Sequence, residues 1–104
     1  MVKIEVVNIK TYKGKGEYIG RPSALGNPFN VTKKTPRAES IKKYRVWLWE
    51  KFKSKDTKVI AELERLLSIC RKEKNLVLKC YCKPLACHGD IIKSCLLWRL
   101  SKNS

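Results

Sequence analysis

The sequence contains no apolar run that approaches the roughly 18 to 20 residues of a membrane span. Its first residues, MVKIEVVNI, alternate apolar and polar side chains, whereas a secretory signal has a continuous apolar stretch and a small-residue cleavage site. Internal repeats, linkers and low-complexity tracts are also missing. We therefore expect a cytoplasmic, intracellular protein without membrane association, folded as one α/β domain over residues 1–104.

Acidic residues are scarce, since 9 Asp and Glu stand against 24 Lys and Arg and the formal net charge is +15. A field of this size attracts polyanions such as nucleic acids and smaller anions such as nucleotides. A solubilising, thermophile-like surface is an equally weighted explanation, because lysine outnumbers arginine, the more specific phosphate ligand, by 18 to 6. The hydrophobic fraction of 43% excludes a disordered chain.

The number of cysteines is odd, which together with the missing signal argues against a secreted disulfide scaffold. In a cytosolic protein, cysteines indicate buried thiols, a metal site or a reactive thiol. The five positions are Cys70, Cys80, Cys82, Cys87 and Cys95.

Three strands are predicted from local pattern. Residues 2–9 alternate with period two, and residues 17–20 indicate a short second strand, which the glycine-marked turn between them could pair with the first in a hairpin. Residues 76–82 begin with a purely apolar run, which favours a central strand covered on both faces.

Three helices are predicted from apolar spacing. The first begins at Pro36, the second near Asp56 or Thr57, and the last runs from about Gly89 to Leu100. The resulting order, β-β-α-α-β-α, predicts a small α/β sheet of three or four strands with a parallel central pair, packed by three helices.

The segment CYCKPLACHGD (80–90) places cysteines, a histidine and an aspartate where a central strand ends and a helix begins. Ligands bind at this edge of open α/β sheets, and a helix start favours anions and lowers the pKa of a nearby thiol. Cys82 or Cys87 could be a reactive thiol with His88 as its base. Alternatively, a metal could be ligated by Cys80, Cys82, Cys87 and His88, or the cysteines could be buried structural residues. Because the ligand spacing is unlike that of zinc knuckles, we predict no tetrahedral metal site within one chain.

The segment GRPSALGNPF (20–29) fits neither the Rossmann nor the P-loop glycine pattern. Gly20 and Gly26 allow close backbone approach, Arg21 suits a phosphate or carboxylate, Asn27 can donate and accept, and Phe29 could stack or anchor the loop. An ordinary turn is the alternative, because Gly-Asn-Pro is strong turn chemistry.

Together, the two segments resemble an uncharacterised "domain of unknown function" family of small proteins from bacteria, phages and archaeal viruses. The resemblance runs from about Val7 to Leu96 and implies a compact α/β fold in which both motifs form one pocket, without an established reaction. The matching residues are Gly20, Arg21, Leu25, Gly26, Asn27, Pro28, Phe29, Tyr44, Leu48, Cys80, Cys82, Pro84, Cys87, His88, Gly89 and Asp90.

Three functions remain open, and the sequence identifies no cofactor. The first is a site for a nucleotide or another phosphorylated or nucleobase compound, with His88 or Asp90 as acid/base and Cys82 or Cys87 as nucleophile if it is catalytic. The second is non-catalytic DNA or RNA binding, and the third is a Cys/His metal module that binds a protein. Nucleic-acid phosphates would contact Lys33, Lys34, Lys42, Lys43 and Lys51, near the aromatic residues Tyr44, Trp47 and Trp49.

Overall fold

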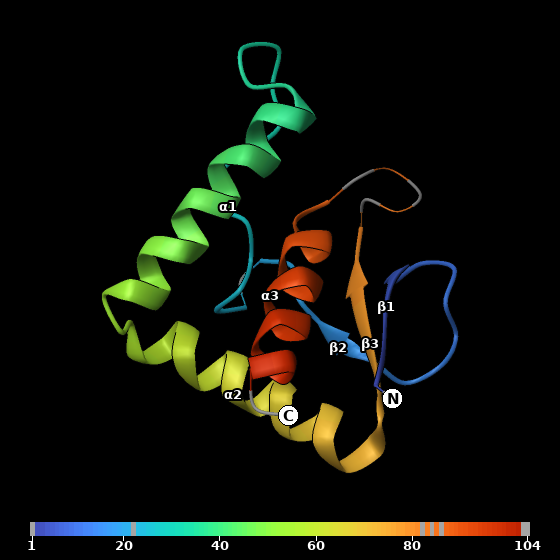
Figure 1. Cartoon of the computed structure of the whole chain (residues 1–104). Coiled ribbons are helices and arrows are strands. Elements are labelled where there is room, and N and C mark those ends of the chain that lie inside the picture. The colour runs from blue at the N-terminus through green and yellow to red at the C-terminus, as the bar shows by residue number, and fades with distance from the viewer. Residues whose placement is uncertain (1, 22, 82, 84, 86, 103–104) are drawn as a thin grey trace.

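The apolar strand β3 (Asn75–Cys80) is the central strand of a three-stranded sheet, as its sequence predicts (Figure 1). The computed structural model describes residues 2–21, 23–81, 83, 85 and 87–102. Strand β1 (Lys3–Asn8) and the short strand β2 (Glu17–Tyr18) lie on either side of β3, and both run parallel to it. The carboxyl ends of all three strands therefore meet at one edge of the sheet.

The possible hairpin between the first two strands is not formed, because Glu17 pairs with Leu78 and Tyr18 pairs with Lys79, so β2 pairs with β3 and not with β1. The segment 9–16 instead passes over one face of β3: a Cβ on Gly16 would lie 3.0 Å from Val77 Cγ1. Lys79 Nζ lies 5.9 Å from the centre of the Tyr12 ring on the same side. Covering both edges and both faces of β3 buries its apolar run, which a simple hairpin of β1 and β2 would not do.

Three helices complete the predicted order, namely α1 (Arg37–Lys53), α2 (Thr57–Glu73) and α3 (His88–Lys102). The start of α2 is fixed by Asp56, whose side chain accepts a hydrogen bond from the Val59 N–H at 3.1 Å. Among the described residues, none of these helices is long and apolar enough to cross a membrane.

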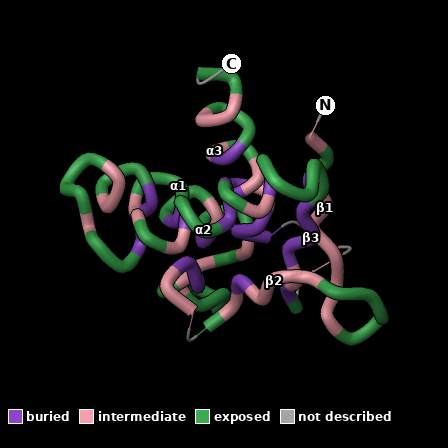
Figure 2. The backbone as a smooth tube through the Cα atoms, turned by 90° about the horizontal axis from the view of Figure 1, so that it is seen from below, coloured by how far each residue is buried: buried purple, intermediate pink, exposed green. Residues whose placement is uncertain are grey.

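All three helices share a core with the face of the sheet formed by Ile4, Leu76 and Leu78. Figure 2 shows the buried stretches gathered between α2, α3 and β3, while the outer turns of α1 are largely exposed. Helix α3 approaches the sheet closely at Gly89, where an added Cβ would lie 2.7 Å from Val6 and 2.8 Å from Ile19. The glycine of the CHGD motif thus brings the start of α3 against the sheet edge.

Candidate functional site

A pocket of about 320 Å³ lies at the carboxyl edge of β2 and β3. Both sequence motifs contribute to it, together with the first turns of α1 and α3. Its lining residues are Tyr18, Gly20, Arg21, Asn27, Phe29, Asn30, Val31, Arg37, Ser40, Ile41, Tyr81, Cys87 and His88.

The loop 20–31 is held on α1 by buried polar contacts. The Tyr44 hydroxyl donates to the Leu25 carbonyl at 2.7 Å, and burial raises the Tyr44 pKa, which keeps that hydroxyl protonated. Ser40 Oγ donates to the Phe29 carbonyl at 2.7 Å. Asn27 Nδ2 donates to Ser40 Oγ, and Asn27 Oδ1 accepts from the Phe29 N–H. Asn27, predicted to contact a ligand, thus uses one donor and one acceptor to shape the loop that forms the pocket.

The two glycines of this loop lie in close contacts, Gly26 with the backbone and Gly20 with the end of the Tyr18 side chain. A Cβ on Gly20 would lie 2.3 Å from the Tyr18 hydroxyl, which donates to the Arg21 carbonyl at 2.7 Å. A Cβ on Gly26 would lie 2.9 Å from the Arg21 backbone nitrogen. Both glycines therefore fold the backbone tightly around Arg21, which fits the close approach predicted from sequence.

Two arginines give the pocket its charge. Arg21 and Arg37 both line it, and no Asp or Glu occurs among its lining residues in the described ranges. The Arg21 guanidinium donates through Nη1 to the Asn30 side chain. Arg37 and His88, the first residues of α1 and α3, both line the pocket, so the positive ends of two helix dipoles lie near it. The arrangement favours an anion.

His88 connects the start of α3 to β2. Its Nε2 lies 2.7 Å from the Ile19 carbonyl, and because a carbonyl can only accept, the neutral ring carries its proton on Nε2. The ring also contacts Tyr44 edge-on, with centroids 5.1 Å apart. Burial lowers the His88 pKa, so the side chain is neutral at pH 7. His88 can hold the start of α3 against the end of β2, and its Nδ1 lone pair can accept a hydrogen bond.

Cys87 lines the pocket and is almost fully buried against Cys80, with the two Sγ atoms 3.3 Å apart. The Cys80 contact and burial raise the Cys87 pKa far above that of an ordinary thiol, which disfavours the nucleophilic thiolate. Cys82, the other predicted nucleophile, lies outside the described residues. Within the described part of the chain, no three His, Cys, Asp or Glu side chains are grouped to hold a metal.

Asp90 does not line the pocket. Its carboxylate pairs with Lys83 Nζ at 2.8 Å. It also accepts from the Cys87 N–H at 3.4 Å and so reaches back from the first turn of α3 to the residue before the helix. It lines a separate hollow beside β1 with Lys83 and Lys93. The structure thus brings Gly20, Arg21, Asn27, Phe29, Cys87 and His88 together and leaves Asp90 on the other side of the helix start.

Several lining residues were not identified from the sequence, among them Tyr18, Asn30, Arg37, Ser40 and Tyr81. Arg37 could have been identified from the sequence, because it directly follows the Pro36 that begins the first helix, and a helix start binds anions that an arginine there could also contact. Nothing in the local pattern shows that Ser40, unlike the other polar residues of this helix, is buried.

Three of the five predicted nucleic-acid lysines lie around a second hollow, on the outer face of α1. Lys42, Lys43 and Lys51 line it together with Trp47. Lys33 and Lys34 are exposed in the segment that precedes α1.

The family model of a domain of unknown function, DUF4326, matches residues 4–98, so the chain belongs to this family. The match confirms the resemblance to an uncharacterised family that the two motifs indicate. No curated protein and no solved structure matches the chain.

Proposed function

We propose that this DUF4326 protein binds a small phosphorylated ligand of the nucleotide class in the pocket between its two motifs. The observation that carries the proposal is the meeting of Arg21, Arg37 and two helix starts around one cavity without a lining carboxylate in the described ranges. Guanidinium groups bind phosphate through paired, charge-assisted hydrogen bonds, and helix starts add N–H donors and a partial positive charge.

The size and the remaining lining support a nucleotide rather than a bare phosphate. About 320 Å³ is near the lower end of small-molecule sites, which suits one nucleotide-sized molecule. Tyr18, Phe29 and Tyr81 offer aromatic surface for a nucleobase, and the Tyr18 and Tyr81 rings contact each other edge-on at 5.9 Å. Asn8 Nδ2 donates to the Lys83 carbonyl at 2.7 Å and so fixes the segment that carries Tyr81.

The proposal is one of binding. The raised pKa of Cys87 favours its thiol, and Asp90 is paired with Lys83 away from the cavity. Neutral His88 donates to Ile19 and is better suited to accept a hydrogen bond from a ligand than to neutralise its charge. Catalytic roles for Cys82, Cys87, His88 and Asp90 stay predictions from the sequence.

Calorimetric titration with adenosine 5′-monophosphate, adenosine and inorganic phosphate tests the proposal. We expect the monophosphate to bind most tightly, because only it uses both the arginines and the aromatic surface. The double variant R21Q/R37Q should weaken its binding by tenfold or more, since each charge-assisted hydrogen bond contributes about 1.5–3 kcal/mol.

A matched control, R45Q/R71Q, removes two positive charges from exposed helix positions that do not line the pocket and should bind like the wild type. The proposal is wrong if the wild type binds none of the three compounds, if adenosine binds as tightly as its monophosphate, or if both double variants behave alike.

A further inference from the structure

The second hollow, here called the α1 hollow, measures about 620 Å³ and runs along the outer face of the helix. Phe29 lines both this hollow and the pocket, so the two sites are neighbours with one shared wall. Among the described residues, the α1 hollow is lined by Phe29, Glu39, Lys42, Lys43, Val46, Trp47, Glu50, Lys51 and Ser54.

A lysine, an indole and a lysine follow each other along this face. Lys43, Trp47 and Lys51 are spaced by four residues, which places them in one row along a helix over about 12 Å. Lys51 Nζ lies 5.9 Å from the centre of the Trp47 ring. The Tyr44 ring packs against the same indole, with ring centroids 5.3 Å apart. The Trp47 side chain is therefore positioned by Tyr44 and lies between Lys43 and Lys51 in the row.

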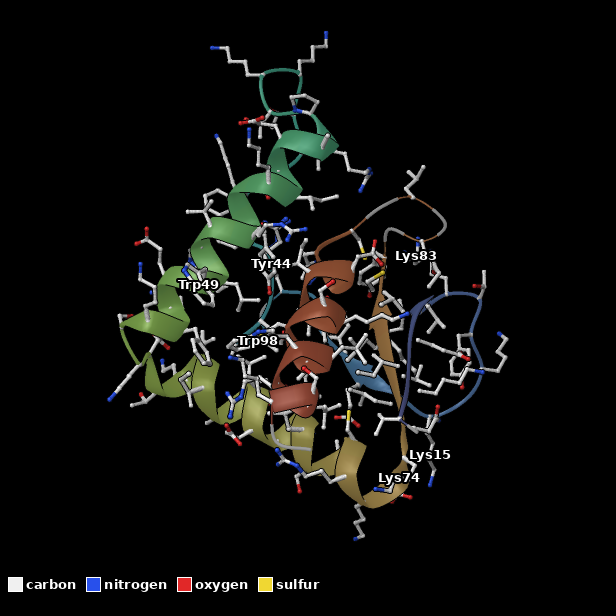
Figure 3. All side chains as sticks on the ribbon, in the orientation of Figure 1. Lys15, Tyr44, Trp49, Lys74, Lys83 and Trp98 are labelled. Atoms are coloured by element: carbon white, nitrogen blue, oxygen red, sulfur yellow. The ribbon has the colours of Figure 1, made fainter. Side chains whose placement is uncertain are left out.

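The aromatic residues Trp49 and Phe52 of α1 do not line the α1 hollow. Trp49 and Phe52 contact Trp98 of α3, with ring centroids 6.2 Å apart in each pair, and Figure 3 shows Trp49 and Trp98 where α1 faces α3. The α1 hollow adjoins the hollow between α1 and α3, with which it shares Val46 and Glu50. Glu39 and Glu50 also line it, but the stretch from residue 30 to 60 carries 10 basic against 3 acidic residues, so its field is positive.

We propose that the partner of this surface is single-stranded nucleic acid, with one nucleotide in the pocket and the adjoining phosphates and bases following the α1 hollow. This inference rests on the function proposed above and names its ligand class more closely. Lysines neutralise successive phosphates, and an aromatic ring between them stacks on a base of any sequence. A duplex keeps its bases paired and could not use Trp47 or the pocket in this way.

The test compares the octanucleotide dT8, labelled with fluorescein, with adenosine 5′-monophosphate by anisotropy and calorimetry across a salt series. We expect dT8 to bind at least tenfold more tightly and with a steeper salt dependence. The variant K42Q/K43Q/K51Q should reduce the slope of log affinity against log salt by about 2, at about 0.7 per lost phosphate contact, and leave monophosphate binding unchanged.

Two further variants keep the result interpretable. K13Q/K58Q/K72Q makes the same charge change at exposed positions that do not line the α1 hollow, and it should alter the slope by less than a third as much. K42Q/K43Q spares Lys51, whose Nζ lies 3.5 Å from the Asp56 carboxylate that begins α2, and should still reduce the slope by about 1.4.

The outcomes separate the two proposals. One outcome is that the monophosphate binds through the arginines but dT8 binds no more tightly than it does. Another is that the two triple variants change the salt slope equally. In either case the α1 hollow is not a nucleic-acid surface, and the function proposed for the pocket stands. If the lysine variants weaken the binding of dT8 while R21Q/R37Q changes the binding of neither dT8 nor the monophosphate, both proposals are wrong. A duplex of the same length that binds as tightly as dT8 would contradict the single-stranded partner.

Discussion

His88 contributes to its motif through its contacts in the fold rather than through a charge. It is the single histidine of the chain, it is 7% exposed, and it joins the start of α3 to the Ile19 carbonyl and the Tyr44 ring. The sequence predicts a histidine near a ligand site, and His88 lies in the lining of the pocket between the two motifs. The hydrogen bond to Ile19 could not be predicted, because it joins residues 69 positions apart.

The lowered pKa of His88 makes a prediction for stability against pH. Above its ordinary pKa of about 6.5 the ring is neutral in both the folded and the unfolded chain, and its contribution is complete. As the pH falls below that value, the unfolded chain takes up a proton that the folded protein resists, so the free energy of unfolding decreases.

Urea unfolding of wild type and His88→Gln between pH 5 and pH 8 measures this effect. The glutamine amide can still donate to the Ile19 carbonyl but does not titrate, so the variant should lack the histidine's share of the slope. Equal slopes for the two proteins would show that burial of His88 does not oppose its protonation.

At the scale of elements, the pocket depends on the attachment of the loop 20–31 to α1. That attachment rests on Tyr44 and Ser40, which stand one helical turn apart and hold the loop at Leu25 and Phe29. In Figure 3 the Tyr44 side chain leaves α1 on the side that faces α3. The helical spacing of Tyr44 predicts a buried residue but does not identify the carbonyl that its hydroxyl binds.

Tyr44→Phe should therefore lower the free energy of unfolding by about 1–3 kcal/mol, because the buried Leu25 carbonyl loses its donor while the ring remains in place. It should also weaken ligand binding, since the loop that carries Arg21 becomes less well held. Chemical denaturation measures the first effect and calorimetry the second. Tyr12→Phe, in the segment 9–16 away from the pocket, is the control, and an equal loss there would contradict the assigned role.

The order of elements was predictable because each rests on local information. Apolar alternation in β1, helical spacing in α2 and the Asp56 cap are all visible in the chain. The pairing of β2 with β3 was not predictable, because a two-residue strand has almost no pattern and its partner lies about 60 residues away. The meeting of the two motifs followed from a general rule, that parallel strands end at a common edge.

At the scale of the whole molecule, the net charge of +15 is evident from the sequence, but the sequence does not show what the charge is for. The fold gives part of it a location, since the arginines of the pocket and the lysines of the α1 hollow lie on neighbouring surfaces joined by Phe29. A uniformly charged surface that served only solubility would give every lysine the same small effect on anion binding.

The most direct measurement of the central claim is a nitrogen–proton correlation spectrum of the labelled protein during titration with adenosine 5′-monophosphate. We expect saturable shifts concentrated at the backbone amides of Gly20, Arg21, Arg37, His88 and Gly89, because the phosphate would sit at the two helix starts between the arginines. Shifts that are absent, spread evenly over the lysines, or confined to the hollow beside Asp90 would contradict the assignment of the pocket as the ligand site.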